Sequence, residues 1–552
     1  MGLRQSLAQF YSRTAGRPDK ALPWLNKAVE RARAEKSPRL PAMLASRVSC
    51  LLHPRVDDLP EARRSINELL SSFPDYLQGL ILAAEVHARV GEIDQAIDRL
   101  DEFLRNRPDD NFARYQRALH RVGLGQLGAA VEDLEAIKHT DRLALELEPR
   151  LLLARLHRDA GRPKLWIREL ESLVADAPDS ARALEALLRA YVRDQRTEEA
   201  ERTVTKWINR APPKAKARAL FTRSRILLQQ GDEGKALADA KRADLLLEHS
   251  AEAVAKVLAT YARLGRPGPG IDYYQRYAPK ASPSAALISS YARLLAGADR
   301  HEEAVNQFRR AMRLGIDDSA AAMRVVTGNL RAAFASEEAA TAAIALFRRE
   351  CEAVVARAND RILLELHLVT GRQDEAIRKL EELIAGSSDD RRRARLLHKL
   401  GDLFQVAEQP RRARQSYEES LTYAPDSWIV LNNLGYLLSD RLHEHQRARD
   451  FAARAVSLAP NVATLDTLGW ILVGLGEYRS AIAHLHRAVR TDPDHLLSRF
   501  HLGEAYRRNG QFDQASTVLG AGQDLARLVD DKDLVARFTT SLTRVAESDT
   551  AQ

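Results

Sequence analysis

Six residues match the glycine fingerprint of dinucleotide-binding proteins: Gly123-Leu124-Gly125-Gln126-Leu127-Gly128. In such proteins the glycines follow a β-strand, and a phosphate lies at the N-terminus of the next helix. Here the motif falls in a turn between two expected helices, and Ala130 follows at a position where alanine recurs along the chain. The motif therefore predicts a helix–helix turn and no nucleotide site.

Histidines and cysteines are the next candidates, for metal binding or nucleophilic catalysis. His443, Glu444 and His445 are adjacent at a turn, and His484 and His486 are two apart in a helical stretch, so each set points to different sides. No Ser-His-Asp set can be assembled. Each of the two cysteines is expected to be a buried thiol: Cys50 and Cys351. We therefore expect no metal, no cofactor and no catalytic residue, and predict that the chain is not an enzyme.

The composition is that of a helix-rich globular chain. Of 552 residues, 45% are hydrophobic and only 6% are aromatic, which is low for an all-β protein. Two cysteines exclude a disulfide framework. The net charge of +8 comes from 84 basic against 76 acidic residues. The basic runs are scattered, which is typical of solvated helix faces and not of a single nucleic-acid-binding stripe.

Nothing in the sequence indicates a membrane segment. An apolar run of about 18 residues, as a membrane helix needs, is absent. The N-terminus also lacks the apolar core of a signal peptide. The prediction is a cytoplasmic protein, or a periplasmic or envelope-associated one if Met1 is not the natural start and a leader is missing.

Two marks recur along the chain. A glycine is followed five residues later by an alanine at Gly16/Ala21, Gly91/Ala96, Gly125/Ala130, Gly231/Ala236, Gly371/Ala376, Gly476/Ala481 and Gly510/Ala515. A proline follows an alanine by twelve residues at Ala62/Pro74, Ala96/Pro108, Ala200/Pro212, Ala413/Pro425, Ala448/Pro460 and Ala481/Pro493. Prolines of consecutive units are 33 to 35 residues apart.

Each mark has a physical reason. The glycine suits a turn because left-handed backbone costs it little. Acidic residues after it, such as Glu92, are expected to cap the next helix. The alanine is small because two helices cross there, and the proline ends the second helix. Helix–turn–helix units are expected to start near Gly2, Met43, Leu77, Asn111, Glu146, Ala181, Ala217, Ala251, Ala285, Ser319 and Ala358, before four clearer C-terminal units.

Two stretches break the pattern. Residues 266–270 (Arg-Pro-Gly-Pro-Gly) and residues 280–284 are expected to be loops. Residues 319–356 are alanine-rich and lack both marks. After Ala526, the apolar spacing predicts a last helix that closes the stack, as repeat arrays require.

The C-terminal units carry a family resemblance. Leu431-Asn432-Asn433-Leu434-Gly435-Tyr436 and Leu465-Asp466-Thr467-Leu468-Gly469-Trp470 occupy corresponding places in consecutive units. They resemble the tetratricopeptide repeat of bacterial proteins, a 34-residue helix–turn–helix unit. The resemblance implies an all-α chain, an α-solenoid of about fifteen such repeats that forms a right-handed superhelix.

The quality of the pattern suggests four regions. Residues 1–265 are expected to form divergent repeats, and residues 266–393 irregular repeats with loops. Residues 394–527 contain the four well-matched repeats, and residues 528–552 the capping helix and a tail.

In the family, the first helix of each unit lines a concave groove that holds a ligand. Carried onto the C-terminal units, the resemblance implies that these side chains line the groove: Arg395, His398, Asn432, Tyr436, Asp466, Trp470, Phe500 and Arg507. Tyrosine, tryptophan and arginine are frequent anchors of protein interfaces. Packing between units is the other interpretation of Tyr436 and Trp470.

Some relatives clamp the C-terminal carboxylate of chaperone tails with lysine, arginine and two asparagines. Of those positions only Asn433 matches here, and Asp402 would repel a carboxylate. We therefore do not expect that mode of binding.

The resemblance implies a non-enzymatic scaffold or adaptor that binds a peptide or protein segment. One alternative is a helical-repeat binder of RNA, which the pI of 9.4 permits but which no recurring basic groove position supports. The other is an accessory subunit of an envelope export or regulatory complex.

Overall fold

The structure, a computed structural model, describes residues 18–53, 56–137, 143–177, 180–194, 196–210, 213–316, 320–349, 367, 372–529 and 531–549. Within these ranges the regular elements are 29 α-helices and one short 3-10 helix, with no strand. Because consecutive helices pack in pairs along the chain, the predicted all-α solenoid is confirmed.

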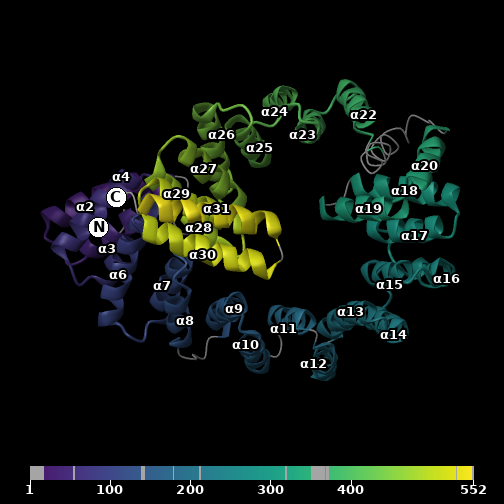
Figure 1. Ribbon diagram of the computed structural model, residues 1–552, viewed down its shortest axis with the longest axis horizontal. Helices are drawn as coiled ribbons and strands as arrows, with labels where there is room; N and C mark the ends of the chain where they lie inside the picture. Colours follow the sequence, from purple (N-terminus) through teal and green to yellow (C-terminus); the bar gives the residue numbers. More distant parts are fainter. Residues whose placement is uncertain are drawn as a thin grey trace. The chain divides into compact units, whose positions relative to one another are not determined.

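The chain forms two compact units, each described separately (Figure 1). Unit 1 combines Met1–Trp166 with Ala424–Gln552. Its N-terminal helices are α2 (Pro18–Ala34), α3 (Leu40–Leu51), α4 (Leu59–Ser72), α5 (Leu77–Arg89), α6 (Ile93–Asn106), α7 (Asn111–Gly123), α8 (Leu127–Glu135) and α9 (Leu143–Asp159). Its C-terminal helices are α25 (Trp428–Asp440), α26 (His445–Leu458), α27 (Val462–Gly474), α28 (Tyr478–Thr491), α29 (Leu496–Arg508), α30 (Phe512–Leu528) and α31 (Lys532–Asp549).

Unit 2 is Ile167–Tyr423. It contains most of α10 (Pro163–Asp176), then α11 (Ala181–Arg193), α12 (Thr197–Arg210), α13 (Pro213–Gln230), α14 (Glu233–Leu246), α15 (Ala251–Arg263), α16 (Pro267–Tyr277), the 3-10 helix η2 (Ala278–Lys280), α17 (Ala285–Gly297), α18 (His301–Ile316), α19 (Ala320–Ala333), α20 (Glu337–Arg349), α22 (Gln373–Ala385), α23 (Asp390–Val406) and α24 (Pro410–Tyr423). The predicted region boundaries after residues 265, 393 and 527 stay a prediction.

The helix ends follow the repeat marks. Five predicted unit starts are the first residue of a helix: Leu77, Asn111, Ala181, Ala251 and Ala285. At the other end, a helix stops two residues before each of five marked prolines: Pro74, Pro108, Pro425, Pro460 and Pro493. The residue before a proline avoids helical backbone, which explains this constant offset. Gly2, Ser319 and Ala358 lie outside the described residues.

The turn glycines adopt the expected backbone, and the acidic residue after them caps the next helix at Asp232 but not at Glu92. Gly91 and Gly125 have φ of 83° and 74°, values at which a side chain would be strained. Glu92, the N-cap of α6, makes no capping hydrogen bond with its side chain. The Glu92 carboxylate instead pairs with the His87 ring (2.9 Å) and with Arg63 (3.0 Å). The acidic residue thus joins neighbouring helices.

The predicted loop at 266–270 is wrong, because α16 begins at Pro267. A proline at the first position of a helix removes only an N–H group that has no intrahelical partner. The Gly270 N–H donates to the Arg266 carbonyl, which closes the first turn of the helix (3.4 Å). Two prolines and two glycines are therefore tolerated within this first turn.

The marked alanines lie where helices cross. Ala413, Ala448, Ala481 and Ala515 are all completely buried in second helices of the C-terminal repeats. A larger side chain there would push the two helices of a unit apart. The burial of these alanines therefore supports the interpretation that alanine recurs where two helices cross.

Within unit 1, helices from the two ends of the chain pack on one another: α5 and α7 contact α28, and α9 contacts α30 (Figure 1). We call this contact the α7–α28 joint. The His120 ring of α7 stacks on the His486 ring of α28, with centroids 5.3 Å apart. An added Cβ at Gly123 would overlap the imidazole of His486. A Cβ at Gly125 would lie 2.7 Å from the Thr517 carbonyl oxygen of α30.

Ion pairs border the joint. Arg158 of α9 binds Asp494, in the turn after α28, at 2.6 Å. Asp94 of α6 accepts a hydrogen bond from Gln514 of α30 at 3.3 Å. These contacts join residues more than 330 positions apart in the sequence. The repeat marks do not predict such pairings, since each mark describes only a unit and its neighbours.

The C-terminal helix closes the stack as predicted. α31 packs on α30 and α29, and Phe538 is completely buried. The Phe538 ring meets the Phe500 ring edge-on, with centroids 5.6 Å apart.

Two further expectations concern single features. Cys50 is buried and unpaired, and burial raises the pKa of its thiol; Cys351 lies outside the described residues. Among the described helices, none combines the length and the apolar character that crossing a bilayer requires.

Candidate functional site

An exposed stripe runs along α25 at the predicted groove positions. Ile429, Asn432 and Tyr436 follow one another at spacings of three and four residues, which places them on one side of a helix. Ile429 is 42% exposed and Tyr436 is 41% exposed, although both are large and apolar. Asn432 between them is half-buried, and its amide oxygen is buried without a hydrogen-bond partner among the described residues. We call these three residues the α25 stripe.

The predicted groove residues of α27 are held in place by His501 of α29. Asp466 is buried, and its carboxylate binds the His501 Nδ1 atom at 3.0 Å. The Trp470 ring stacks on the His501 ring, with centroids 4.2 Å apart and an angle of 17° between the ring planes. Burial raises the pKa of Asp466, but the electrostatic interaction and the hydrogen bond with His501 outweigh it, so that the pKa lies below its usual value. Asp466 therefore positions the histidine on which Trp470 rests.

Of the two predicted residues of α29, Phe500 contacts the capping helix and Arg507 pairs within its own helix. Phe500 is buried, with Arg537 of α31 above its ring at 4.3 Å. Arg507 binds Glu504 through both guanidinium and carboxylate groups, at 2.9 and 3.1 Å. Phe500 is thus inaccessible in the folded chain, while Arg507 is half-buried in a local ion pair.

The remaining predicted residues belong to unit 2. Arg395 of α23 is exposed. His398 is half-buried and lies 3.4 Å from Asp402, whose other carboxylate oxygen accepts a hydrogen bond from Tyr417 at 2.6 Å. The structure therefore brings the groove residues of α27 and α29 together, with the α25 stripe in the same unit, and places Arg395 and His398 in another body.

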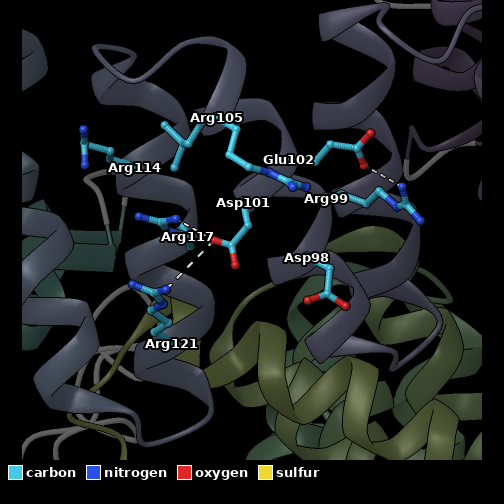
Figure 2. A pocket seen from close by; sticks show the side chains of 9 residues that line it. Asp98, Arg99, Asp101, Glu102, Arg105, Arg114, Arg117 and Arg121 are labelled. Carbon is cyan, nitrogen blue, oxygen red and sulfur yellow. Dashed lines mark hydrogen bonds and ion pairs between the residues drawn. The ribbon is translucent and has the colours of Figure 1, made fainter.

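An arginine-rich hollow of about 780 Å³ lies between α6 and α7 (Figure 2). Arg114, Arg117 and Arg121 form one stripe of α7, and Asp98, Asp101, Glu102 and Arg105 form the facing stripe of α6. Figure 2 shows the guanidinium groups of Arg117 and Arg121 converging on Asp101.

A buried carboxylate binds two of these arginines. Asp133 of α8 is 3% exposed, and it binds Arg117 (3.1 Å to Nε) and Arg121 (2.8 Å). These hydrogen bonds raise the pKa of Arg117 against the opposing effect of burial. The carboxylates thus neutralise much of the hollow, which makes it first of all a structural ion-pair network.

The described residues contain no group of three metal-ligating side chains. The fingerprint glycines 123, 125 and 128 lie at the end of α7, in the turn and at the start of α8, as predicted for a helix–helix turn.

The tetratricopeptide repeat family matches the chain in four places. Residues 81–142, 151–216 and 398–463 match one form of the repeat, and residues 472–531 match another. A TPR repeat-containing protein of Pseudomonas aeruginosa is 40% identical over 81 residues. The chain is a tetratricopeptide repeat protein. The stretch shared with the Pseudomonas protein spans 14% of this chain and 14% of that relative.

Solved structures resemble this tetratricopeptide repeat protein at low identity. Naa15/Naa10 bound to HypK-THB is 15% identical, with 92% of this chain and 80% of that chain covered and a TM-score of 0.37. Yeast Tom70 is 13% identical, with 93% and 96% covered and a TM-score of 0.33. MamA from Desulfovibrio magneticus RS-1 is 20% identical, with 32% and 95% covered and a TM-score of 0.28.

Sequence reasoning missed three residues around the tetratricopeptide groove positions. They are His501, Arg508 and Arg537; Arg508 lies over the Trp470 ring at 5.6 Å. His501 comes one residue after the position that corresponds to Asp466 in the next repeat. The repeat length in the sequence was the signal that could have identified His501, because residues one repeat apart lie on adjacent first helices, which are side by side.

Proposed function

We propose that the chain is a non-enzymatic scaffold that holds a peptide or protein segment against the first helices of its C-terminal repeats. The tetratricopeptide repeats support a role in protein interaction. The α25 stripe and Trp470 are the contact residues of the proposal. Repeat arrays offer such extended surfaces ready-made, so little ordering of the scaffold is needed on binding.

The observation that carries the proposal is the exposure of the α25 stripe. Ile429 and Tyr436 lie two helical turns apart on one face, and each leaves about two fifths of its surface in solvent. The valine and the leucines of this helix are all buried, whereas Trp428 at its start is half-buried. Because about three fifths of each side chain is already buried, covering the exposed remainder would release about 1 kcal/mol for each.

Asn432 adds a polar contact between the two apolar ones. Its amide oxygen is buried and unpaired among the described residues, so the side chain must rotate outward to bind a ligand. A peptide backbone supplies both the donor and the acceptor that an asparagine amide can use. The stripe therefore suits an extended or helical segment with apolar side chains about two turns apart.

Trp470 is arranged as a rigid platform. His501 supports one face of the indole, and the guanidinium of Arg508 lies over the ring. A ring that is already fixed loses little side-chain entropy when a ligand covers its exposed part. The same contacts also serve packing between repeats, so a binding experiment is needed to decide whether Trp470 contacts a ligand.

The test uses full-length protein as bait from the native host, with bound proteins identified by mass spectrometry. We compare the parent with Tyr436→Ala/Trp470→Ala and with the control Leu458→Ala/Val529→Ala, which shortens two exposed apolar side chains of the same unit (43% and 50% exposed) outside the stripe. Circular dichroism confirms that both variants fold. We expect one or more partners that the first variant loses and the control retains.

Two results would contradict the proposal. Equal capture by the parent and by Tyr436→Ala/Trp470→Ala would remove the groove from the interaction. Recovery of nucleic acid alone, released between low and moderate salt, would replace the scaffold with the RNA-binding alternative. A partner that is part of an envelope or regulatory complex would identify the chain as an accessory subunit, still acting as a scaffold.

A further inference from the structure

A second pocket, in unit 2, lies between α14 and α16 and measures about 480 Å³. We call it the tyrosine pocket. Its lining residues follow helical spacing on both helices and continue into the turn after α14: Lys241, Arg242, Leu245, His249, Pro269, Asp272, Tyr273, Arg276 and Tyr277. It shares no residue with the α25 stripe or with the α27 and α29 residues.

A buried carboxylate organises the pocket from behind. Asp244 is completely buried, and one of its oxygens binds both the Tyr273 hydroxyl and the His249 Nδ1 atom, each at 2.6 Å. Burial and the bond to Asp244 raise the pKa of Tyr273, so its hydroxyl stays protonated and donates. Because a carboxylate only accepts, Nδ1 of His249 also donates, and Nε2 is left for another partner.

The backbone beside the pocket adopts an unfavourable conformation. Glu248 and His249 have φ of 51° and 56°, in the left-handed region that residues with side chains rarely occupy. Such conformations persist when surrounding contacts fix them, and they are frequent at binding sites. Here the stacking of His249 on Tyr277, with centroids 4.3 Å apart, is one such contact.

The cations around the pocket are not neutralised. Lys241, Arg242 and Arg276 have no carboxylate within salt-bridge distance among the described residues. The Lys241 ammonium lies 5.5 Å from the Tyr261 ring and 5.8 Å from the Tyr273 ring, and Arg276 lies 5.5 Å from the Tyr277 ring. Cation–π contact fixes their position but leaves their charge available to an anion. The α6–α7 hollow differs, because carboxylates there already bind Arg117 and Arg121.

An apolar rim lies beside these charges. Leu245 is 66% exposed, among the largest values for an apolar side chain in the described chain, and Pro269 is exposed opposite it. An anion that binds the cations would thus have an apolar surface next to it. A ligand that matches both features has a carboxylate adjacent to an apolar side chain.

We propose that the tyrosine pocket binds a peptide segment in which a carboxylate lies next to a bulky apolar side chain. The carboxylate is placed between Lys241 and Arg276, within reach of His249, and the apolar side chain on Leu245 and Pro269. Arginine and lysine form their strongest hydrogen bonds with such oxyanions.

A nucleic acid fits the pocket less well. Bases bind to open aromatic faces, whereas here the rings of Tyr273 and Tyr277 pack on each other (4.5 Å) and Tyr277 also stacks on His249. The site is separate from the α25 stripe, so its test does not depend on the function proposed for that stripe.

The test measures fluorescence anisotropy of labelled peptides with the full-length chain. The first probe is an acetylated and amidated peptide with the core Leu-Glu-Leu-Asp-Leu, and its matched control has Gln and Asn in place of Glu and Asp. A second pair has the neutral core with either a free C-terminal leucine carboxylate or its amide. These two pairs distinguish side-chain from C-terminal carboxylates as the source of the anion.

The variant is Lys241→Glu/Arg276→Glu. Its matched control, Lys206→Glu/Lys214→Glu, makes the same change of charge at exposed positions of α12 and α13 in the same unit. We expect at least one carboxylate probe to bind the parent, with a Kd at least tenfold higher for the pocket variant and unchanged for the control. Tyr436→Ala/Trp470→Ala protein is expected to bind that probe as the parent does.

The proposal is overturned if no carboxylate probe binds the parent, or if both charge-reversal variants weaken binding equally, which would indicate attraction to overall charge. It is also overturned if a ten-nucleotide deoxythymidine strand binds more tightly than the peptides and displaces them. Loss of binding only in Tyr436→Ala/Trp470→Ala would move the site to the groove. Circular dichroism and the thermal midpoint confirm that each variant is folded.

Discussion

Gly123 has no side chain, which allows α7 to lie against α28. The imidazole of His486 occupies the space that a Cβ would need, and its Nε2 lies 3.3 Å from the His120 carbonyl oxygen. Gly128, five residues later in the same fingerprint, has no atom within 4 Å of the position of an added Cβ. Two glycines of one motif therefore have different physical roles.

We predict that Gly123→Ala destabilises the α7–α28 joint by about 2 kcal/mol, because overpacking of this kind costs roughly 1–3 kcal/mol. Hydrogen exchange followed by mass spectrometry measures the effect locally. Protection of α7 and α28 amides is expected to fall by about thirtyfold, since 1.4 kcal/mol corresponds to a factor of ten.

The matched control is Gly128→Ala, which is expected to leave this protection unchanged or to increase it, because alanine favours helix over glycine by up to about 1 kcal/mol. Unchanged protection of α28 in Gly123→Ala would mean that the two helices do not pack together in solution.

At the scale of elements, α6, α7 and α8 are joined by charge as well as by apolar packing. Asp133 of α8 lies beneath Arg117 and Arg121 of α7, and Arg117 also binds Asp101 of α6 at 2.5 Å. Three helices from two consecutive repeats thus share one network. Asp98, in the same hollow, has no ion-pair partner among the described residues.

We predict that Asp133→Ala destabilises this part of unit 1 by about 3 kcal/mol, because removing one partner of a buried ion pair leaves the other charges uncompensated. Urea denaturation measures the loss of stability, and hydrogen exchange measures the loss of protection in α7 and α8. Asp98→Ala is the control and is expected to change stability by less than about 0.5 kcal/mol, as exposed positions do. Equal effects of the two substitutions would show that burial of Asp133 does not matter.

At the scale of the molecule, the described structure adds a joint between distant repeats to the nearest-neighbour contacts of a solenoid. Burial and the neighbouring Arg490 lower the pKa of His486 to about 3. Burial and Arg487 lower the pKa of His484, in the same helix, to about 4. The same causes, burial first and then Arg490, bring the pKa of His120 well below its usual value. The joint is therefore built around neutral histidines.

We predict that acidification weakens unit 1. Below pH 6.5 the unfolded chain binds protons at these histidines and the folded chain does not, so stability is complete above pH 6.5 and falls as the pH decreases toward the folded pKa. Between pH 7.5 and 5.5 each such histidine contributes a loss of about 1.4 kcal/mol. Carboxylates stay largely ionised in this window.

Thermal unfolding of the parent and of His486→Gln at the two pH values tests the prediction. The decrease in midpoint between pH 7.5 and 5.5 is expected to be smaller for His486→Gln, whereas His443→Asn, at an exposed turn, is expected to behave as the parent. An identical pH dependence in all three proteins would exclude His486 from the linkage.

The repeat could be predicted from the amino-acid pattern alone. Glycine, alanine and proline each act through local backbone or contact geometry, so their positions predicted the turns, the buried crossings and the helix ends over most of the chain. The pattern also selected the surface of the α25 stripe, since the first-helix positions of a repeat follow from its register. The error at Pro267 arose because a proline that ends one helix can equally begin the next.

Which of the predicted groove residues are accessible depends on the packing of helices from different units. Phe500 and Asp466 occupy groove positions in the repeat, yet α31 and His501 bury them, because such burial depends on residues from other units. The α7–α28 joint and the tyrosine pocket were invisible for the same reason: both depend on side chains from different helices, and in the joint these are more than 330 residues apart. A periodic sequence specifies how a unit meets its neighbour, whereas contacts between distant units depend on how the small rotations from unit to unit add up along the chain.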